Sequence, residues 1–232
     1  MSSRHCLVTG ANRGLGLEFV RQLLARGDRV VATCRHPGKA TALNQLAGEF
    51  PGRVHVLPLD VAAPKSITEL ARELPLVCET LDLLVNGAGV LHSGERFGSL
   101  DPNNLDDSFR TNARGPLLLT QALAPLLADN ARVANITSEL GSIAALERFG
   151  TPSYNISKAA QNMATALLAK ALQARGIIVL ALHPGWVQTD MGGSGATLTP
   201  SQSVQGLLRV IEATTLESSG RFFDWRGEAM TW

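Results

Sequence analysis

The sequence predicts an α/β fold in which one doubly wound, mostly parallel sheet of about seven strands has helices on both faces. Three observations support this prediction. Short apolar runs typical of buried strands alternate with amphipathic, helix-like stretches from one end of the chain to the other. The 232 residues are 45% hydrophobic, which is enough for a large core. Because no linker and no internal repeat interrupts the pattern, we expect residues 1–232 to form a single domain.

The order of the expected elements follows from apolar periodicity and turn residues. The first strand begins at Cys6, and the first helix has apolar residues at Leu17, Val20, Leu23 and Leu24. Further strands are expected at 29–34, 54–57, 81–85, 132–137, 177–182 and 220–223, and further helices at 39–47, 66–74, 106–128, 153–175 and 201–212. Polar loops follow the fourth, fifth and sixth strands, at 90–104, 138–152 and 183–200. Since ligands of open α/β sheets bind at the carboxyl ends of the strands, we expect the site among these loops.

A glycine-rich turn links the first strand to the first helix, with Gly10, Gly14 and Gly16 in the spacing G-x-x-x-G-x-G. Such a turn brings backbone N–H groups and the positive end of a helix dipole to one point. Glycines leave room for a phosphate to reach the backbone. The spacing differs from the G-x-G-x-x-G dinucleotide fingerprint, and a glycine-rich turn without a ligand is the competing interpretation.

Tyr154 and Lys158 are four residues apart on an expected helix, so their side chains share one face. An ammonium close to a phenol favours the phenolate and is expected to lower the pKa of Tyr154 from about 10 toward neutrality, as a general acid–base requires. Ser138 follows the fifth strand at the ligand edge, where its hydroxyl could hold a carbonyl oxygen. A solvated surface Tyr–Lys pair and a capping serine are the alternatives.

Composition excludes several function classes. The net charge is +1 and no run of Lys or Arg occurs, so we expect neither nucleic acid nor membrane as a partner. Cys6, Cys34 and Cys78 are widely spaced, which indicates buried thiols in a reducing compartment. No His/Cys/carboxylate spacing supports a metal site. The first strand begins too early for a signal peptide, and we expect a cytoplasmic protein.

The motifs together resemble those of the short-chain dehydrogenase/reductase family. The resemblance covers essentially the whole chain and consists of motif residues in the family's order: Thr9, Gly10, Gly14, Gly16, Asn86, Ala88, Gly89, Ser138, Tyr154 and Lys158. Within the family, the stretches 116–121, 183–191 and 220–225 resemble the branch that contains bacterial C-factor and the sniffer-type carbonyl reductases. The resemblance implies a Rossmann-type NAD(P)-binding oxidoreductase domain.

The resemblance also implies a role for individual residues. Tyr154 is the expected proton donor and acceptor, Lys158 lowers its pKa and holds the nicotinamide ribose, and Ser138 binds the substrate carbonyl. Asn112 matches an asparagine that holds a water within a helix, although an asparagine there could also satisfy backbone groups. The expected cofactor contacts, besides Tyr154 and Lys158, are Gly10, Asn12, Arg13, Gly14, Leu15, Gly16, Arg35, Asp60, Val61, Asn86, Ala88, Gly89, Pro184, Gly185, Val187 and Thr189.

The residues after the second strand bear on the choice of cofactor. NAD-preferring enzymes usually place a carboxylate there, whereas this chain has Cys34 followed by Arg35. Together with Arg13 in the glycine-rich turn, Arg35 suits the 2′-phosphate of NADP, because guanidinium groups pair bidentately with phosphate. NADP(H) is therefore the expected cofactor, with NAD(H) possible. One departure from the family pattern is Gly87, where an asparagine is usual, and its loss could loosen the local turn.

We expect an NADP(H)-dependent reductase that interconverts a small-molecule aldehyde or ketone and the alcohol. The alternative is a cofactor-binding signalling or regulatory protein of the C-factor type, in which turnover is secondary. The expected helices at 106–128 and 153–175 are rich in Leu and Ala over broad faces. Helix-on-helix contacts through these faces predict a homodimer or homotetramer, and burial within one subunit is the alternative.

Overall fold

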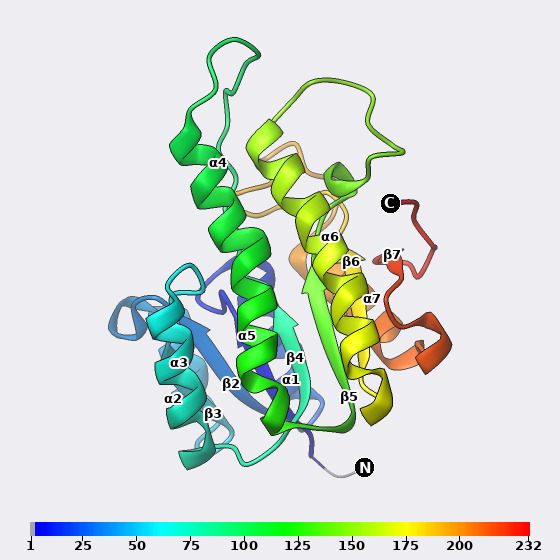
Figure 1. Cartoon of the computed structure of the whole chain (residues 1–232). Coiled ribbons are helices and arrows are strands. Elements are labelled where there is room, and N and C mark those ends of the chain that lie inside the picture. The colour runs from blue at the N-terminus through cyan, green and yellow to red at the C-terminus, as the bar shows by residue number, and fades with distance from the viewer. Residues whose placement is uncertain (1–2) are drawn as a thin grey trace.

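Within residues 3–232, which the computed structural model describes, seven strands form one sheet in the order β3-β2-β1-β4-β5-β6-β7 (Figure 1). All six pairings are parallel. The strands are β1 (His5–Thr9), β2 (Arg29–Cys34), β3 (Val54–Pro58), β4 (Leu81–Asn86), β5 (Leu127–Ile136), β6 (Ile178–His183) and β7 (Phe222–Asp224). The predicted doubly wound sheet is confirmed. Its strand order reverses between β1 and β4, which opens a crevice at their carboxyl ends.

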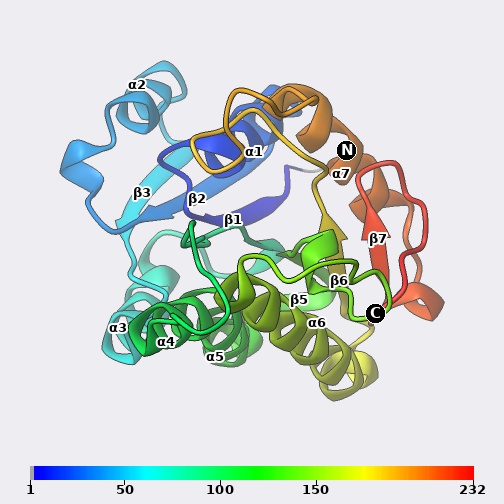
Figure 2. The ribbon, with the colours of Figure 1, turned by 90° about the horizontal axis from the view of Figure 1, so that it is seen from above.

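Helices cover both faces of the sheet (Figure 2). One face carries α1 (Gly14–Ala25), α2 (Thr41–Glu49) and α7 (Pro200–Ala213), and the other carries α3 (Pro64–Glu73), α4 (Pro102–Phe109), α5 (Gly115–Leu123) and α6 (Pro152–Leu172). Each face buries a separate hydrophobic cluster, one around Phe19 and Leu207 and one around Leu70, Leu119 and Leu168. Burial on both faces explains why the strands are continuously apolar.

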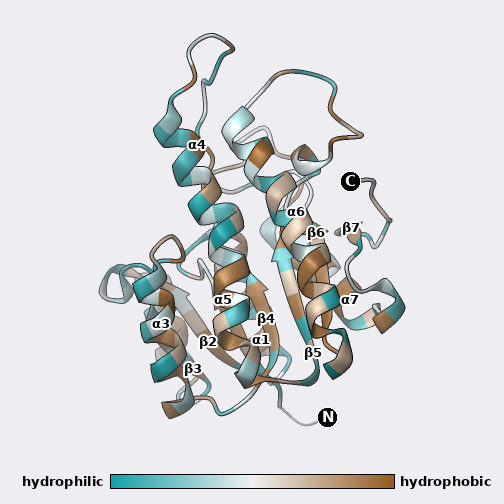
Figure 3. Ribbon diagram, viewed as in Figure 1, coloured by the Kyte–Doolittle hydropathy of each residue, from teal (hydrophilic) through white to brown (hydrophobic). Residues whose placement is uncertain are grey.

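The long helix expected at 106–128 differs from the prediction at both ends. It begins at Pro102, because the Asp101 carboxylate accepts a hydrogen bond from the Asn103 N–H at 2.9 Å and caps the helix. A π-helical turn over Arg110–Arg114 separates α4 from α5. The helix ends before Leu127, which already pairs with Leu81 in the sheet. Figure 3 shows that α4 is largely hydrophilic and α5 largely hydrophobic, so the two halves have different surroundings.

Smaller boundary shifts have local causes. A 3₁₀ turn over Pro37–Lys39 delays α2, and a proline at the first position starts α3 earlier than expected. The last turn of the helix expected to end at residue 175 is 3₁₀, and it ends at Gly176 with φ +67°. Gly220, with φ +82°, is a turn residue, so β7 begins only at Phe222.

The loops that follow β4 and β5 extend beyond the carboxyl ends of the strands, as predicted (Figure 1). The turn between β1 and α1 opens onto the same edge. This edge therefore gathers the glycine-rich turn and the polar loops around one crevice. Among the helices of residues 3–232, none is long and apolar enough to cross a membrane.

Candidate active site

A cavity of about 580 Å³ lies at the carboxyl ends of the strands. Most of the predicted site residues line it: Gly10, Asn12, Arg13, Gly14, Leu15, Gly16, Arg35, Asp60, Val61, Ala88, Gly89, Tyr154, Lys158, Pro184 and Thr189. Five predicted residues are not part of the lining: Asn86, Asn112, Ser138, Gly185 and Val187. One continuous cavity thus joins the glycine-rich turn to the predicted catalytic pair.

The glycine-rich turn packs too closely for side chains. Gly10 has φ +66°, and a Cβ there would lie 2.9 Å from the Ala88 Cα. A Cβ on Gly16 would lie 2.3 Å from the carbonyl oxygen of Gly10. The Thr9 hydroxyl accepts hydrogen bonds from the N–H groups of Gly87 and Ala88, at 3.0 and 3.1 Å, and joins the ends of β1 and β4. These contacts leave no room for a side chain at either glycine, so the turn presents backbone, which a phosphate group could approach.

We predict that Gly16→Ala lowers the free energy of unfolding by about 1–3 kcal/mol, because the new methyl group overlaps backbone that cannot move away. The matched control is Gly48→Ala in α2, where a Cβ meets no atom within 4 Å. Alanine in this exposed helical position should stabilise the protein by up to about 1 kcal/mol. Urea denaturation of both variants checks the prediction, and an equal effect of the two substitutions would contradict it.

The N-terminus of α1 is free to bind an anion. Its N-cap residue Arg13 makes no side-chain capping bond, and the first turn contains no acidic residue within the described chain. The N–H groups and the positive end of the helix dipole therefore face the cavity without a carboxylate in the helix's own first turn. This geometry suits a pyrophosphate.

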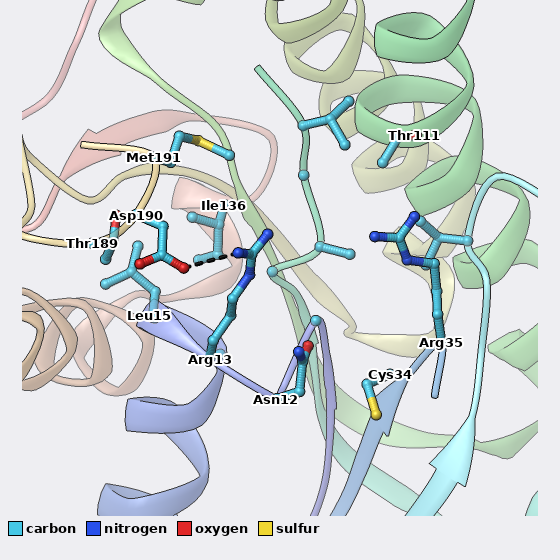
Figure 4. A pocket seen from close by; sticks show the side chains of 18 of the residues that line it. Asn12, Arg13, Leu15, Cys34, Arg35, Thr111, Ile136, Thr189, Asp190 and Met191 are labelled. Carbon is cyan, nitrogen blue, oxygen red and sulfur yellow. Dashed lines mark hydrogen bonds and ion pairs between the residues drawn. The ribbon is translucent and has the colours of Figure 1, made fainter. Parts of the chain in front are cut away.

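Basic side chains lie at two sides of the cavity (Figure 4). Arg35 lies beyond the end of β2, near Cys34, whereas Arg13 turns toward the opposite wall and pairs with Asp190 at 2.8 Å. His36 and Lys39 also line the cavity and were not among the predicted residues. Their position shortly after Arg35, in the turn that closes the second strand, is the sequence feature that could have revealed them.

The environment of Tyr154 contradicts the prediction of a lowered pKa. Its side chain is 7% exposed, and burial raises its pKa to about 12, although a hydrogen bond with Ser138 acts in the opposite direction. The Lys158 ammonium lies 5.5 Å from the centre of the phenol ring. The loss of water around the buried phenol dominates over the effect expected from the lysine charge. The phenol is therefore protonated at neutral pH.

Lys158 is buried and lines the cavity. Its ammonium donates hydrogen bonds to the carbonyl oxygen of Ile136 at 2.8 Å and to Oε1 of Gln161 at 2.9 Å. Burial lowers its pKa to about 7. Since an ammonium has three N–H donors and two are used, one remains for the cavity. Gln161 is buried one helical turn after Lys158, a spacing that could have revealed it.

Asn112 lies in the π-helical turn between α4 and α5. Its side chain accepts a hydrogen bond from the Val90 N–H at 2.8 Å and donates to the Val90 carbonyl oxygen and to the Ser157 hydroxyl, both at 2.9 Å. These contacts agree with the interpretation that the asparagine satisfies backbone groups, whereas its role in holding a water stays a prediction. Asn112 joins the loop after β4 to the helix that carries Tyr154.

Of the other predicted residues outside the lining, Asn86, Ser138 and Val187 are buried, whereas Gly87 next to Asn86 belongs to the lining. The Asn86 amide is 1% exposed and donates hydrogen bonds to Thr120 and Asn135, so its side chain supports the sheet instead of facing the cavity. Gly87 keeps its turn through its own N–H, which donates to the Val85 carbonyl oxygen and the Thr9 hydroxyl. Gly87 stands where the family usually has an asparagine. The hydrogen bonds of its backbone N–H therefore hold the turn without that side chain.

Burial also shifts the pKa values of the three cysteines and of His183. The three cysteines are free and buried, and burial raises the pKa of each thiol. His183 accepts a hydrogen bond from the Glu139 N–H, and burial lowers its pKa. Within residues 3–232 no group of three or more His, Cys, Asp or Glu side chains is arranged for a metal ion.

A comparison with known families identifies this architecture. The model of the family described as short chain dehydrogenase matches residues 4–197. The chain belongs to the short-chain dehydrogenase/reductase family. It is therefore an oxidoreductase that acts on carbonyl or alcohol groups. The family prediction made from the motifs is confirmed.

Several family members are similar over most of the chain. The C-signal protein of Myxococcus xanthus is 46% identical over 154 residues, which cover 66% of this chain and 93% of that protein. The 1-hydroxy-2-glutathionyl-2-methyl-3-butene dehydrogenase of Rhodococcus sp. (strain AD45) is 36% identical over 230 residues, covering 97% of this chain and 98% of the relative. The similar proteins thus include one that is named as a dehydrogenase and one that is named as a signal protein.

Two solved structures superpose over the full length of both chains. The NADPH-bound carbonyl reductase from chicken fatty liver has a TM-score of 0.94 and 38% identity. The carbonyl reductase Sniffer of D. melanogaster has a TM-score of 0.94 and 31% identity. These matches confirm the placement near the C-factor and sniffer-type branch.

Proposed function

We propose that residues 1–232 form one NADP(H)-dependent carbonyl reductase domain that interconverts an aldehyde or ketone and the alcohol, with Tyr154 as general acid–base. The observation that carries the proposal is that Tyr154 and Lys158 line the same cavity as the glycine-rich turn. The NADPH bound to the similar chicken carbonyl reductase supports the choice of cofactor. The substrate is a small carbonyl compound that enters between the loops after β4 and β5.

The residues of the cavity fit this cofactor. The glycine-rich turn and the N-terminus of α1 would hold the pyrophosphate, and Arg35 with Lys39 would hold the 2′-phosphate. Lys158 would offer its remaining N–H to the nicotinamide ribose. When bound, NADPH supplies the hydride, whereas the protein supplies orientation and the proton. The protonated phenol of Tyr154 is in the correct state to donate that proton to the carbonyl oxygen, which the Ser138 hydroxyl would hold.

Asp190 should weaken NADPH binding, because its carboxylate occupies Arg13 and opposes the cofactor phosphates. The Arg13 and Asp190 side chains are 69% and 76% exposed, so the pair contributes at most about 1 kcal/mol. We predict that Asp190→Asn lowers the NADPH dissociation constant by up to about fivefold. Titration of cofactor fluorescence measures the effect. The control is Asp129→Asn, which removes an equally exposed carboxylate paired with Arg175. Unchanged or weaker NADPH binding by Asp190→Asn would contradict the prediction.

The proposed function is tested by following NADPH oxidation with a panel of aldehydes, ketones and quinones, together with titrations of NADPH and NADH binding. Turnover with tighter binding of NADPH than NADH is the expected result. Tighter binding of NADH would contradict the interpretation of Arg35 and Lys39. Cofactor binding without turnover on any carbonyl compound would count against a reductase.

A signalling protein is the second candidate, and the 46% identity to C-signal favours it. In such a protein NADP(H) binding would matter and turnover would be secondary. A buried acid–base residue beside a lysine argues for catalysis, because binding alone needs no proton donor. The biological output of a Tyr154→Phe protein separates the two candidates, since a signal survives the substitution and a reductase does not.

We infer a homodimer or homotetramer from apolar side chains on the outer helices. Ile156, Met163 and Leu167 lie along one side of α6 and are 56%, 62% and 59% exposed, and Phe109 at the end of α4 is 48% exposed. Because α4 and α6 pack against each other, these residues belong to one side of the molecule. Analytical ultracentrifugation measures the oligomeric state.

A further inference from the structure

A carboxylate from the loop after β4 holds the start of the helix that carries Tyr154. Oε2 of Glu95 accepts hydrogen bonds from the Ser153 hydroxyl at 2.8 Å and from the Ser153 N–H at 3.2 Å. Ser153 is 1% exposed and directly precedes Tyr154. The two partners are 58 residues apart in the chain, so only the folded structure brings them together.

The start of α6 has no other side-chain cap. Thr151, at the N-cap position, has a left-handed conformation with φ 42°, and its hydroxyl bonds to the Asn155 side chain instead of to the backbone. Pro152 has no N–H, so Ser153 provides the first donor that needs a partner. Within the described chain, the first turn contains no acidic residue. Glu95 therefore supplies both the capping acceptor and the negative charge that favours a helix N-terminus.

A second contact joins the same two loops nearer to the solvent. The rings of Phe97 and Phe149 meet edge to face, with centroids 5.7 Å apart. Phe97 follows Glu95 in the loop after β4, and Phe149 lies in the loop that leads into α6. Both rings are exposed, at 85% and 55%, so the contact spans the surface. The loop after β4 is thus attached to the beginning of α6 at two points.

The other oxygen of Glu95 indicates that this attachment is more than a helix cap. Oε1 of Glu95 is buried and has no hydrogen-bond partner among residues 3–232. Burying an unpaired polar atom costs about 1–3 kcal/mol. Thr151 does not supply a cap from its left-handed conformation, so the distant carboxylate caps α6 in spite of this cost. What the distant carboxylate adds is a fixed position of the loop relative to Tyr154.

We propose that Glu95 is a positioning residue, which couples the loop after β4 to the N-terminus of α6 and thereby keeps the Tyr154 side chain in its buried position. The inference rests on the proposed function of Tyr154 as the acid–base. Loss of the carboxylate frees the Ser153 N–H, lets water reach the first turn of α6 and loosens the phenol. The cofactor site is separate, because neither Glu95 nor Ser153 lines the cavity.

The experiment compares Glu95→Ala, Glu95→Gln and the control Glu147→Ala. Glu147 is exposed in the loop before α6 and makes no hydrogen bond or ion pair within residues 3–232. Tyr154 is the only tyrosine of the chain, so the absorbance of tyrosinate during an alkaline titration reports on this residue alone. Amide hydrogen exchange of Ser153 and Tyr154 is measured on the same cofactor-free proteins.

In Glu95→Ala we expect about tenfold faster exchange at Ser153 and a phenol pKa that falls toward its ordinary value of about 10. In the enzyme assay we expect a loss in kcat of about tenfold, with the NADPH dissociation constant unchanged within about twofold. Glu95→Gln, which keeps an acceptor oxygen, should retain most of the phenol shift, and Glu147→Ala should match the wild type.

Unchanged exchange and phenol titration in Glu95→Ala would overturn the proposal, and so would equal effects in Glu147→Ala. Both readouts use the cofactor-free protein and need no turnover. If the wild type reduces no carbonyl compound while Glu95→Ala still shifts the phenol titration, the reductase function fails and the positioning role of Glu95 stands. If turnover is present and Glu95→Ala alters neither readout, the positioning role fails and the reductase function stands.

Discussion

Turnover by the Tyr154→Phe variant is expected to fall by about 10³-fold, whereas NADPH binding changes little. The phenol hydroxyl is the only part that the substitution removes, and a positioned proton donor contributes ~10²–10⁴-fold to the rate. Tyr154 is only 7% exposed in the wild type, and we expect the ring of the phenylalanine to stay in the same buried place. Steady-state oxidation of NADPH and a binding titration measure the two effects separately.

The control for this prediction is Ser153→Ala, which alters the neighbouring side chain and keeps the phenol. Ser153→Ala retains the N–H bond to Glu95 and should lose far less activity than Tyr154→Phe. Equal losses in the two variants would mean that disturbance of α6, and not the missing proton donor, causes the defect. Full activity of Tyr154→Phe would exclude Tyr154 as the acid–base.

The second large effect concerns Lys158 and the pH dependence of stability. Burial lowers the pKa of Lys158 from 10.5 to about 7 in the folded, cofactor-free protein. Between these values the unfolded chain binds more protons than the folded one, so the free energy of unfolding rises with pH. At about 1.4 kcal/mol for each pKa unit, the rise between pH 7 and pH 10 is on the order of a few kcal/mol.

Lys158→Met should remove this rise, because methionine fills similar space and carries no charge. Urea denaturation of the cofactor-free proteins across this pH range measures the difference between the two curves. The cysteine thiols, whose raised pKa values lower stability at alkaline pH, contribute equally to both proteins and cancel. Lys170→Met removes an exposed lysine from the same helix and should leave the slope unchanged. Parallel curves for wild type and Lys158→Met would contradict the prediction.

The sequence by itself determined the class of fold, the family and most of the cavity lining. Alternating apolar runs predict a parallel sheet covered on both faces, because each strand must be buried on both sides. The glycines at positions 10 and 16 mark the close-packed turn between β1 and α1, because their lack of a side chain is a local property. The spacing of Tyr154 and Lys158 likewise places both on one helical face. All of these are short-range features that the order of residues contains directly.

Only the tertiary structure decided how these groups are solvated and what supports them. Burial of Tyr154 reversed the predicted direction of its pKa shift, because desolvation depends on every element packed around the ring. One of the two partners of Lys158 comes from β5, and the partner of Ser153 comes from the loop after β4, both distant in the chain. Arg13 likewise forms its ion pair with Asp190, which is distant in the chain. Proton affinity and capping depend on neighbours in space, and local sequence patterns do not contain those neighbours.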